Sequence, residues 1–325
     1  MELLLARCGW LIVVGGVAVL AAQPAVAGEQ ASAPRAASTK ILMLGDSVTL
    51  GGMPNAVLEA IKGLSSDPSK GLTEHKIEWL TFNAGAGGET AEGGKGRIGA
   101  LLGTEKPDIV TICYGLNEIW QKHSPQRFRD NMNGIIEIVQ THAYAARVVL
   151  ITATPFDNSR HFLGKEKYVL DQGGLDFCLD AQFNGVTRQL ANQRGLPLVD
   201  LHRYFKTDTD PMRYLVQDGV HLNAAGYTFA GSYIARCLLD WYKAEVLKDA
   251  DAIRMRTTVL DRLAKLRVST TDPNERERLL VALDEIWHTC PYLAEQAVIW
   301  HRMTYPAAAS LSCRLTIVGC CSHHG

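Results

Sequence analysis

The chain has 325 residues, of which 47% are hydrophobic and 21% are charged, and its formal net charge is -1. This composition provides enough apolar material for one domain of about 200 residues and a smaller appendage. Because the chain has neither a net positive charge nor a long basic run, its composition does not support nucleic-acid binding driven by counterion release.

Residues 1–27 have the pattern of a secretory signal peptide. Arg7 provides a short positive region, residues 10–22 are uncharged and apolar, and Ala25-Val26-Ala27 is a small-x-small cleavage site. The apolar stretch is shorter than the roughly 20 residues that a membrane-spanning helix needs. We therefore expect a cleaved signal, a secreted or periplasmic protein without a stable membrane span, and a flexible linker over residues 28–39.

The cysteines define no disulfide framework, although export would permit disulfide bonds. Seven cysteines follow residue 27, an odd number without tight spacing, so at least one thiol must stay unpaired. Cys113 and Cys237 lie in apolar segments and are expected to be inert core thiols. The pairing of the others stays open: Cys178, Cys290, Cys313, Cys320 and Cys321.

Between residues 40 and 243, short apolar runs alternate with segments of helical periodicity. The predicted strands are almost entirely apolar, which is typical of a parallel sheet covered on both faces. We therefore predict an α/β fold with strands at residues 41–44, 77–82, 109–114, 148–152 and 197–199, and helices at about residues 54–64, 125–142, 175–194 and 224–242. Asn223 is a good N-cap for the last of these helices.

The first predicted strand ends abruptly at Gly45-Asp46-Ser47. This places a serine hydroxyl at the carboxyl end of a central strand, where the loops of an open α/β sheet diverge and leave a crevice for ligands. Ser47 is therefore a candidate nucleophile. A Gly-Asp-Ser triplet is also an ordinary turn, so the triplet alone is weak evidence.

Asp218 and His221 lie three residues apart in the turn before the last predicted helix. At this spacing a carboxylate can accept a hydrogen bond from an imidazole nitrogen. It then fixes the tautomer of the imidazole and stabilises its charged form, as a general base for a serine requires. Asp-x-x-His is common by chance, so this pair also needs support from other motifs.

That support comes from four motifs that follow predicted strands in chain order: Gly45-Asp46-Ser47, Asn83 to Gly88, Gly115-x-Asn117 and Asp218-x-x-His221. Together they resemble the motifs of the SGNH hydrolases, the superfamily of GDSL esterases and lipases, over about residues 40–242. The resemblance implies a three-layer α/β/α fold, flavodoxin-like, with a parallel five-stranded sheet. It also implies hydrolysis of ester bonds without a metal or an organic cofactor.

Carried over position by position, the resemblance implies that Ser47 is the nucleophile, His221 the general base and later the general acid, and Asp218 the residue that orients His221. It further implies an oxyanion hole made by the backbone N–H groups of Ser47 and Gly88 and the side-chain amide of Asn117. This is physically reasonable, because an oxyanion needs fixed donors and a glycine lets the backbone approach closely.

Two positions depart from the family pattern, which often has Asp where this chain has Glu89 and Glu118. Neither change touches an oxyanion donor, so they bear on the detail of the pocket rather than on activity. Asp46 precedes the nucleophile and is expected to fix the turn rather than to act as a catalytic acid. The long segment over residues 154–174 exceeds a simple connector, so we expect it to line or cover the site and to influence substrate choice.

Three competing patterns are weaker. Gly94-x-Gly96-x-x-Gly99 matches the dinucleotide-binding fingerprint but does not directly follow a strand. Glu285-x-x-His288 lacks the second histidine of a zinc protease, so we expect a solvated helix face there rather than a metal site. The Gly-x-Ser-x-Gly elbow of other α/β-hydrolases is absent from the sequence.

Beyond residue 243 the resemblance ends. Residues 244–310 are expected to form a helical extension that packs against the catalytic domain or against a second subunit. Residues 311–325 contain three cysteines together with His323 and His324. We expect a frayed, disordered tail there rather than a metal site.

Two classes of function follow from these patterns. The first is a secreted serine esterase, for which we favour removal of acetyl or other small acyl groups from carbohydrate, with a lipid-acyl esterase or lysophospholipase as the alternative. The second is a non-catalytic glycan-binding module of the same fold, although the intact Ser47, Asp218 and His221 argue against it. The expected partner is a small acyl ester or an acylated glycan; nucleic acid is not expected, and the oligomeric state is not predicted.

Overall fold

A computed structural model describes residues 38–65, 77–142, 146–254 and 257. The sheet has five strands in the order β2-β1-β3-β4-β5, and every neighbouring pair is parallel. The strands are β1 (Ser38–Gly45), β2 (Glu78–Gly85), β3 (Ile109–Cys113), β4 (Arg147–Ile151) and β5 (Leu198–Val199). The predicted α/β fold with a parallel five-stranded sheet is therefore confirmed.

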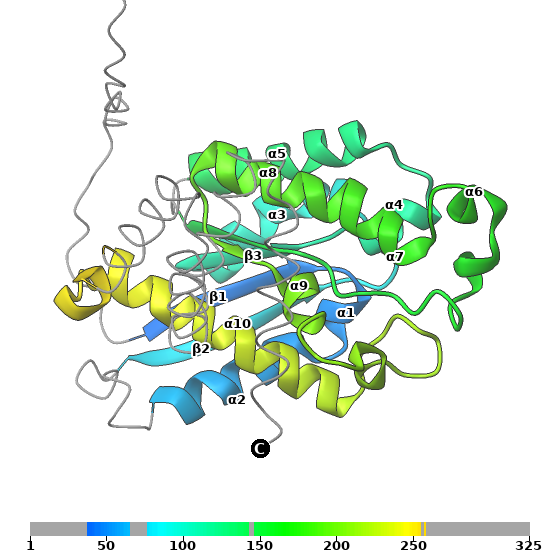
Figure 1. Cartoon of the computed structure of the whole chain (residues 1–325). Helices are drawn as coiled ribbons and strands as arrows, with labels where there is room; N and C mark the ends of the chain where they lie inside the picture. The colour runs from blue at the N-terminus through cyan, green and yellow to red at the C-terminus, as the bar shows by residue number, and fades with distance from the viewer. Residues whose placement is uncertain (1–37, 66–76, 143–145, 255–256, 258–325) are drawn as a thin grey trace, which may run out of the picture. The chain divides into compact units, whose positions relative to one another are not determined.

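Helices cover both faces of this sheet, which gives the predicted three-layer α/β/α arrangement (Figure 1). On one face α2 (Met53–Ser65) packs against α10 (Ala224–Glu245). On the other face α5 (Pro125–Thr141) packs against both α3 (Ala91–Glu105) and α8 (Gly185–Arg194). The shorter elements are α1 (Ser47–Leu50), α4 (Leu116–Trp120), α6 (Lys167–Leu170), α7 (Leu175–Cys178), α9 (Leu201–Phe205), the 3-10 helices η3 (Phe162–Lys165) and η5 (Pro211–Tyr214), and the π-helical η4 (Leu179–Asn184).

The sheet and its covering helices form one hydrophobic core. Residues 41–44 of β1 are at most 2% exposed, as expected for a central strand covered on both faces. In α5, the apolar residues that recur at helical spacing are all buried against this sheet: Phe128, Met132, Ile135, Ile136 and Val139. Burial of the apolar residues of β1 and of α5 in this core holds the carboxyl end of β1 in place.

The strand order places a topological switch point at β1. β2 pairs with one edge of β1 and β3 with the other, so the connections leaving β1 and β2 run to opposite sides of the first strand. In open α/β sheets the loops separate at such a point and leave a crevice at the carboxyl ends of the strands. Ser47 lies at this point, because α1 begins two residues after β1 ends.

Of the element boundaries that differ from the prediction, three bear on the extent of the domain or on the site. β1 begins at Ser38, so residues 38–39 belong to the strand and not to a flexible linker. The Thr39 hydroxyl lies 3.0 Å from that of Tyr242, which connects the start of β1 to the end of α10. β2 extends through Gly85, so half of the predicted Asn83–Gly88 loop is strand. α10 continues to Glu245, beyond the predicted domain end at residue 243.

The predicted helix over residues 175–194 is a continuous run of α7, η4 and α8, in which η4 is π-helical. At the end of η4 the Asn184 side chain accepts a hydrogen bond from Ala153 N at 2.9 Å and donates one to Ala153 O at 3.3 Å. These two bonds tie the helix to the segment that follows β4. Such π-helical turns inside α-helices are frequent at functional sites.

The glycine pattern at residues 94–99 lies inside α3, a helix that the sequence interpretation missed because glycine disfavours helix. At Gly94 an added Cβ would overlap the side chain of Tyr114, which directly follows β3. This glycine therefore allows close packing of α3 on the sheet. A dinucleotide site would instead need the glycines in the turn between a strand and the start of a helix.

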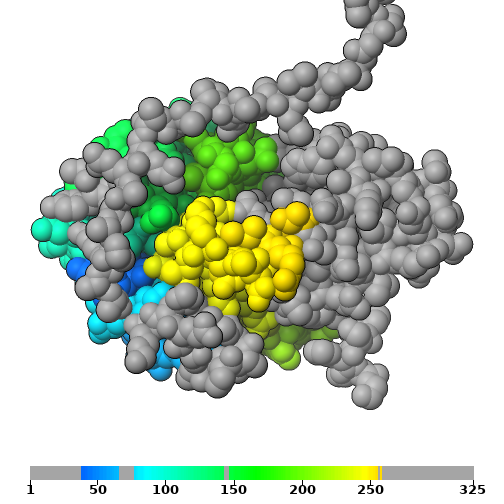
Figure 2. Space-filling model, turned by 90° about the vertical axis from the view of Figure 1, so that its left-hand side faces the viewer, coloured from blue at the N-terminus to red at the C-terminus, as the bar shows by residue number. Residues whose placement is uncertain are grey.

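Several predictions lie outside the described residues. These are the signal peptide, most of the helical extension, Glu285-x-x-His288 and the cysteine-containing tail. Within the described part, Cys113, Cys178 and Cys237 form no disulfide, and the last two are buried. The described part also contains no helix with the length and apolar character to cross a membrane. The end of α10 and residues 250–254 reach the surface, where they appear in yellow in Figure 2.

Candidate active site

The structure brings together the three predicted catalytic side chains, although Ser47 and His221 lie 174 residues apart along the chain. Ser47 Oγ lies 2.8 Å from His221 Nε2. The other ring nitrogen, His221 Nδ1, lies 2.6 Å from Asp218 Oδ2. The three groups thus form a continuous hydrogen-bonded chain from hydroxyl to imidazole to carboxylate, which is the arrangement that activates a serine.

Ser47 lies at the turn from β1 into α1, as the first residue of α1, and its neighbours Asp46 and Val48 are buried. Asp46 caps α1, since its Oδ1 accepts a hydrogen bond from Val48 N at 2.9 Å. Behind this turn, a Cβ added to Gly85 at the end of β2 would overlap the backbone of Leu50. Because α1 and β2 meet backbone to backbone, the position of Ser47 depends on close packing rather than on a mobile loop.

Asp46 has the turn-fixing role that its position predicted. Its side chain is 1% exposed, and its Oδ2 has no hydrogen-bond partner among the described residues. Burial raises the pKa of Asp46 to about 7, although the Val48 N–H and the charge of His221 act in the opposite direction. Its carboxyl lies in the protein interior and binds the backbone of α1.

His221 and Asp218 lie on a surface turn between η5 and α10. Val216 N donates to His221 O at 2.8 Å, and Leu215 forms an antiparallel bridge with Leu222. Gly219, at φ +75°, provides the left-handed conformation that closes this turn. The side chains of His221 and Asp218 remain 40% and 44% exposed. Hydrogen bonds, more than burial, therefore hold this half of the site.

The carboxylate of Asp218 is fixed by the same turn. Its Oδ1 accepts from the N–H groups of Val220 at 2.9 Å and His221 at 3.0 Å. Burial alone would raise the pKa of Asp218, but the hydrogen bonds from the His221 side chain and the two N–H groups outweigh it, so the pKa lies below its ordinary value. Asp218 is therefore ionised at neutral pH and can stabilise a protonated His221.

Two of the three predicted oxyanion-hole residues follow the strands on either side of β1: Gly88 lies in the turn after β2, and Asn117 lies in the short helix α4 after β3. Asn117, the second residue of α4, donates from Nδ2 to Glu89 O at 2.9 Å, which orients the amide. The amide nitrogen has a second N–H, which can donate to another acceptor. Gly88 occupies a turn closed by a bond from Glu89 N to Ala86 O and has φ +72°. A Cβ there would meet open space, so its backbone conformation, not lack of room, favours glycine.

The two glutamates that depart from the family pattern have structural roles that the sequence interpretation missed. The Glu89 carboxylate pairs with Arg97 and accepts from Tyr114 Oη at 2.6 Å. Glu118 is 1% exposed and accepts from Ala91 N at 2.7 Å, which fixes the start of α3. Burial raises the pKa of Glu118 to about 7. Both carboxyls thus support the turn that carries Gly88 and the short helix that carries Asn117.

Part of the segment over residues 154–174 lies against the turn that carries His221, as expected for a segment that borders the site. Asp157 N donates to Gly219 O at 2.8 Å. Near this contact, Phe162 packs edge to face on Trp120 of α4 with ring centroids 5.2 Å apart. Trp120 and Phe162 are 58% and 53% exposed. Two large aromatic rings on the surface beside a candidate site are available to contact a ligand.

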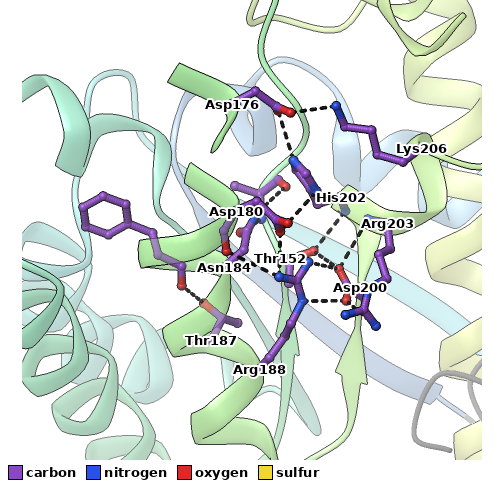
Figure 3. Close-up of polar contacts among 12 residues, drawn as sticks. Thr152, Asp176, Asp180, Asn184, Thr187, Arg188, Asp200, His202, Arg203 and Lys206 are labelled. Atoms are coloured by element: carbon purple, nitrogen blue, oxygen red, sulfur yellow. Dashed lines mark hydrogen bonds and ion pairs between the residues drawn. The ribbon is translucent and has the colours of Figure 1, made fainter. Parts of the chain in front are cut away.

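A buried polar cluster holds the base of this segment (Figure 3). Asp176 Oδ1 accepts from Phe156 N at 3.0 Å and lies 3.0 Å from His202 Nε2. Burial alone would raise the pKa of Asp176, but His202 and Lys206 bring it down to about 2. Deeper in the cluster, Asp200 is fully buried and makes two bonds with Arg188. This cluster anchors α7, η4 and α9 to one another, and no sequence motif indicated it.

Comparison with known proteins gives curated relatives that match part of this chain. The chain is 29% identical over 119 residues to the esterase TesA of Pseudomonas aeruginosa. This match covers 36% of this chain and 55% of that protein. The chain is also 28% identical over 131 residues to an arylesterase of Vibrio mimicus, covering 40% of this chain and 63% of that protein. The chain thus spans little more than half the length of these relatives.

Solved structures and a family model also match. A lipase/acylhydrolase from Enterococcus faecalis superposes with a TM-score of 0.49 and 24% identity, covering 61% of this chain and 94% of that one. An acetyl xylan esterase superposes with a TM-score of 0.44 and 22% identity, covering 60% and 97%. The model of the GDSL-like lipase/acylhydrolase family matches residues 43–229, more than half of the chain. This protein therefore belongs to the GDSL-like lipase/acylhydrolase family.

Proposed function

We propose that this protein hydrolyses carboxylic esters, with Ser47 as nucleophile, His221 as general base and then general acid, and Asp218 as the group that orients His221. One observation carries the proposal: Ser47 Oγ lies 2.8 Å from His221 Nε2 while Asp218 Oδ2 lies 2.6 Å from His221 Nδ1. Family membership and the similarity to proteins named as esterases support the same activity.

In the first half of the reaction, the serine is acylated. With Nδ1–H donating to Asp218, the unprotonated Nε2 of His221 accepts the proton of Ser47 Oγ as this oxygen attacks the ester carbonyl carbon. The carbonyl oxygen becomes an oxyanion. When the tetrahedral intermediate collapses, the carbon–oxygen bond to the alcohol breaks, and the alcohol leaves with the proton from His221 Nε2.

In the second half, water replaces the alcohol. His221 Nε2 accepts a proton from the water as its oxygen attacks the acyl-serine. The second tetrahedral intermediate then expels Ser47 Oγ, which recovers its proton from His221. The products are the free carboxylic acid and the original enzyme. Both halves use the same imidazole nitrogen, so one fixed His221 orientation serves all four proton transfers.

The oxyanion is stabilised by the N–H groups of Ser47 and Gly88 and by the amide of Asn117. Donors of this kind contribute roughly 3–4 kcal/mol each when they are fixed before the reaction. Fixation is supported by the Asn117–Glu89 bond and by the closed turn at Gly88. Asn117→Ala is expected to lower kcat roughly 100- to 1,000-fold.

Our first candidate substrate class is carbohydrate that carries acetyl or other small acyl groups. The sequence supports it through the signal-like residues 1–27, since export suits extracellular glycans. A second candidate is an ester with an apolar chain or ring, such as a lipid-acyl ester. The exposed Trp120–Phe162 pair favours it, as does Leu50, which is 49% exposed and three residues after Ser47.

Hydrolysis of p-nitrophenyl acetate, butyrate and octanoate and of acetylated xylan tests the activity and separates the two candidates. Ser47→Ala and His221→Ala are expected to lower kcat by roughly four to six orders of magnitude. If the wild type and Ser47→Ala are equally inactive on every substrate, a non-catalytic glycan-binding module is the better interpretation. Preference for octanoate that Trp120→Ala abolishes would select the apolar ester over the acetylated glycan.

We also propose, from the sequence, that residues 1–27 direct export and that residues 244–310 are a helical appendage to a catalytic domain at about residues 40–243. The amino-terminal sequence of the protein recovered from periplasm or medium tests the first proposal, with cleavage after Ala27 as the expected result. Recovery with an intact residue 1 from the cytoplasm would contradict it.

A further inference from the structure

The turn formed by residues 157–161, called the brace below, lies against the surface turn that carries Asp218 and His221. Asp157 N donates to Gly219 O at 2.8 Å. A Cβ added at Gly219 would lie 3.0 Å from Arg160 Cβ, Asp157 O and His161 N. The two turns therefore meet backbone to backbone, midway between the proposed orienting carboxylate and the proposed base.

Arg160 connects the brace to the strand-like segment beside His221. Its two terminal nitrogens donate to Val216 O at 3.2 Å and to Met212 O at 2.9 Å. Val216 in turn donates its N–H to His221 O at 2.8 Å. A chain of hydrogen bonds thus runs from the Arg160 guanidinium through Val216 to the backbone of His221.

The guanidinium is itself held in place from within the brace. Its Nε donates to Asp157 Oδ2, while Asp157 Oδ1 accepts from Ser159 N at 2.9 Å and Ser159 Oγ at 2.6 Å. His161 N donates to Asp157 O at 3.1 Å and closes the turn. Because both carboxylate oxygens of Asp157 form hydrogen bonds, the Arg160 guanidinium is already oriented toward the carbonyl groups of Val216 and Met212 before any substrate binds.

From this geometry we propose that Arg160 is a positioning residue for catalysis, which holds the imidazole of His221 at Ser47 by binding the carbonyl groups of Val216 and Met212. Such a clamp is needed because the His221 side chain is 40% exposed and little packing fixes it. A displacement of a catalytic group by about 1 Å can cost roughly 100-fold in rate. The inference rests on the proposed ester hydrolysis and adds a residue outside the triad and the oxyanion hole.

Arg160→Ala tests this role against Arg194→Ala as a matched control. The Arg160 and Arg194 side chains are 35% and 34% exposed, and within the described part of the chain each forms one ion pair. Arg194 binds Glu137 and Asn133 of α5 and not the His221 turn. We expect Arg160→Ala to lower kcat on p-nitrophenyl acetate roughly 10- to 100-fold with KM changed less than about threefold, and Arg194→Ala to leave both within about twofold.

Two further measurements separate positioning from general stability. The apparent pKa in the pH profile of kcat/KM should shift in Arg160→Ala but not in Arg194→Ala, because only the first variant alters how His221 is held. Arg160→Lys keeps the charge but cannot bind two carbonyls as a fork, so its kcat should lie between wild type and Arg160→Ala. If Arg160→Ala does not fold, Arg160→Lys is the variant that tests the proposal. A kcat of Arg160→Lys within about twofold of wild type then overturns it.

Equal kcat values for Arg160→Ala and Arg194→Ala, with an active wild type that depends on Ser47, would overturn the positioning role and leave ester hydrolysis standing. An inactive wild type, or a Ser47→Ala variant as active as wild type, would instead reject the proposed hydrolysis itself. The failure of one proposal is thus distinguishable from the failure of the other.

Discussion

The two halves of the candidate site are built in different ways. Ser47 follows a central strand whose residues 41–44 are at most 2% exposed, and its turn is packed against the backbone of β2. His221 and Asp218 lie on a surface turn with side chains 40% and 44% exposed. Core packing holds the first half, whereas hydrogen bonds from a distant segment hold the second.

This difference indicates where the site is sensitive to change. On the Ser47 side, a substitution that disturbs the turn also disturbs the core, so activity and stability should fall together. On the His221 side, the supporting contacts are polar and partly exposed, and each contributes about 1 kcal/mol to stability. Substitutions there should reduce activity far more than stability.

The largest difference in kcat between the two halves is expected for their acidic residues, Asp218 and Asp46. Asp218→Asn should lower kcat roughly 1,000- to 10,000-fold, because an amide at this position can fix the wrong tautomer of His221. Asp46→Asn keeps the acceptor for Val48 N and should change kcat less than about tenfold. Steady-state rates on p-nitrophenyl acetate check both. Similar losses in the two variants would mean that Asp46 takes part in the chemistry.

A second comparison uses one glycine from each half. Gly85→Ala forces a methyl group into the Leu50 backbone and should destabilise the fold by ~3 kcal/mol, with a loss of activity that follows the unfolded fraction. Gly219→Ala strains a residue at φ +75° and crowds the 157–161 brace, at a cost of about 1–2 kcal/mol.

Urea unfolding and kcat, measured on the same samples, distinguish the two glycine variants. The folded fraction of Gly219→Ala should lose more activity than that of Gly85→Ala. A Gly219→Ala variant with wild-type kcat would contradict the view that polar contacts on this turn set the geometry of His221.

The last expected effect is on the pH dependence of stability and concerns the buried carboxyl of Glu118. Its folded-state pKa of about 7 exceeds the ordinary value of 4.5, so the folded protein binds this proton more tightly than the unfolded chain does. Stability from this group is therefore fully present below pH ~4 and declines as pH rises to about 7, by up to ~3 kcal/mol. Glu118→Gln keeps an acceptor for Ala91 N and should remove this decline.

Melting temperatures of wild type and Glu118→Gln between pH 4.5 and pH 8.5 check the prediction. The variant should gain stability relative to wild type at the upper end of this range. Glu59→Gln is the control, since the Glu59 side chain is 73% exposed. A constant difference between wild type and Glu118→Gln across the range would show that Glu118 does not titrate as described.

The Ser47 half was indicated by a local pattern, a run of apolar residues that ends in Gly45-Asp46-Ser47, and this pattern gained weight from the motifs that follow it along the chain. The signal for the last helix, Asn223 as N-cap, was equally local, and the predicted start of that helix is confirmed. The resemblance to a known family added Gly88 and Asn117, which lie in the turn after β2 and in the short helix after β3. Their roles as oxyanion donors stay predictions.

The contacts that hold the His221 half were beyond local patterns. Arg160 meets Met212 and Val216 more than 50 residues along the chain, and nothing in the sequence around either one indicates the other. Helix α3 was missed because its glycines disfavour a helix, although Gly94 lets it pack closely on Tyr114. Glu118 appeared as a departure from a pattern, and only the fold reveals its bond to Ala91.

The most direct test of the central claim is covalent labelling of the intact protein with a fluorophosphonate, followed by peptide mass spectrometry. The reagent reacts with a serine whose proton a neighbouring base removes. We predict one adduct, on Ser47, formed in step with the loss of esterase activity and greatly slowed in His221→Ala. An adduct on another serine, or full activity after Ser47 is completely labelled, would contradict the account.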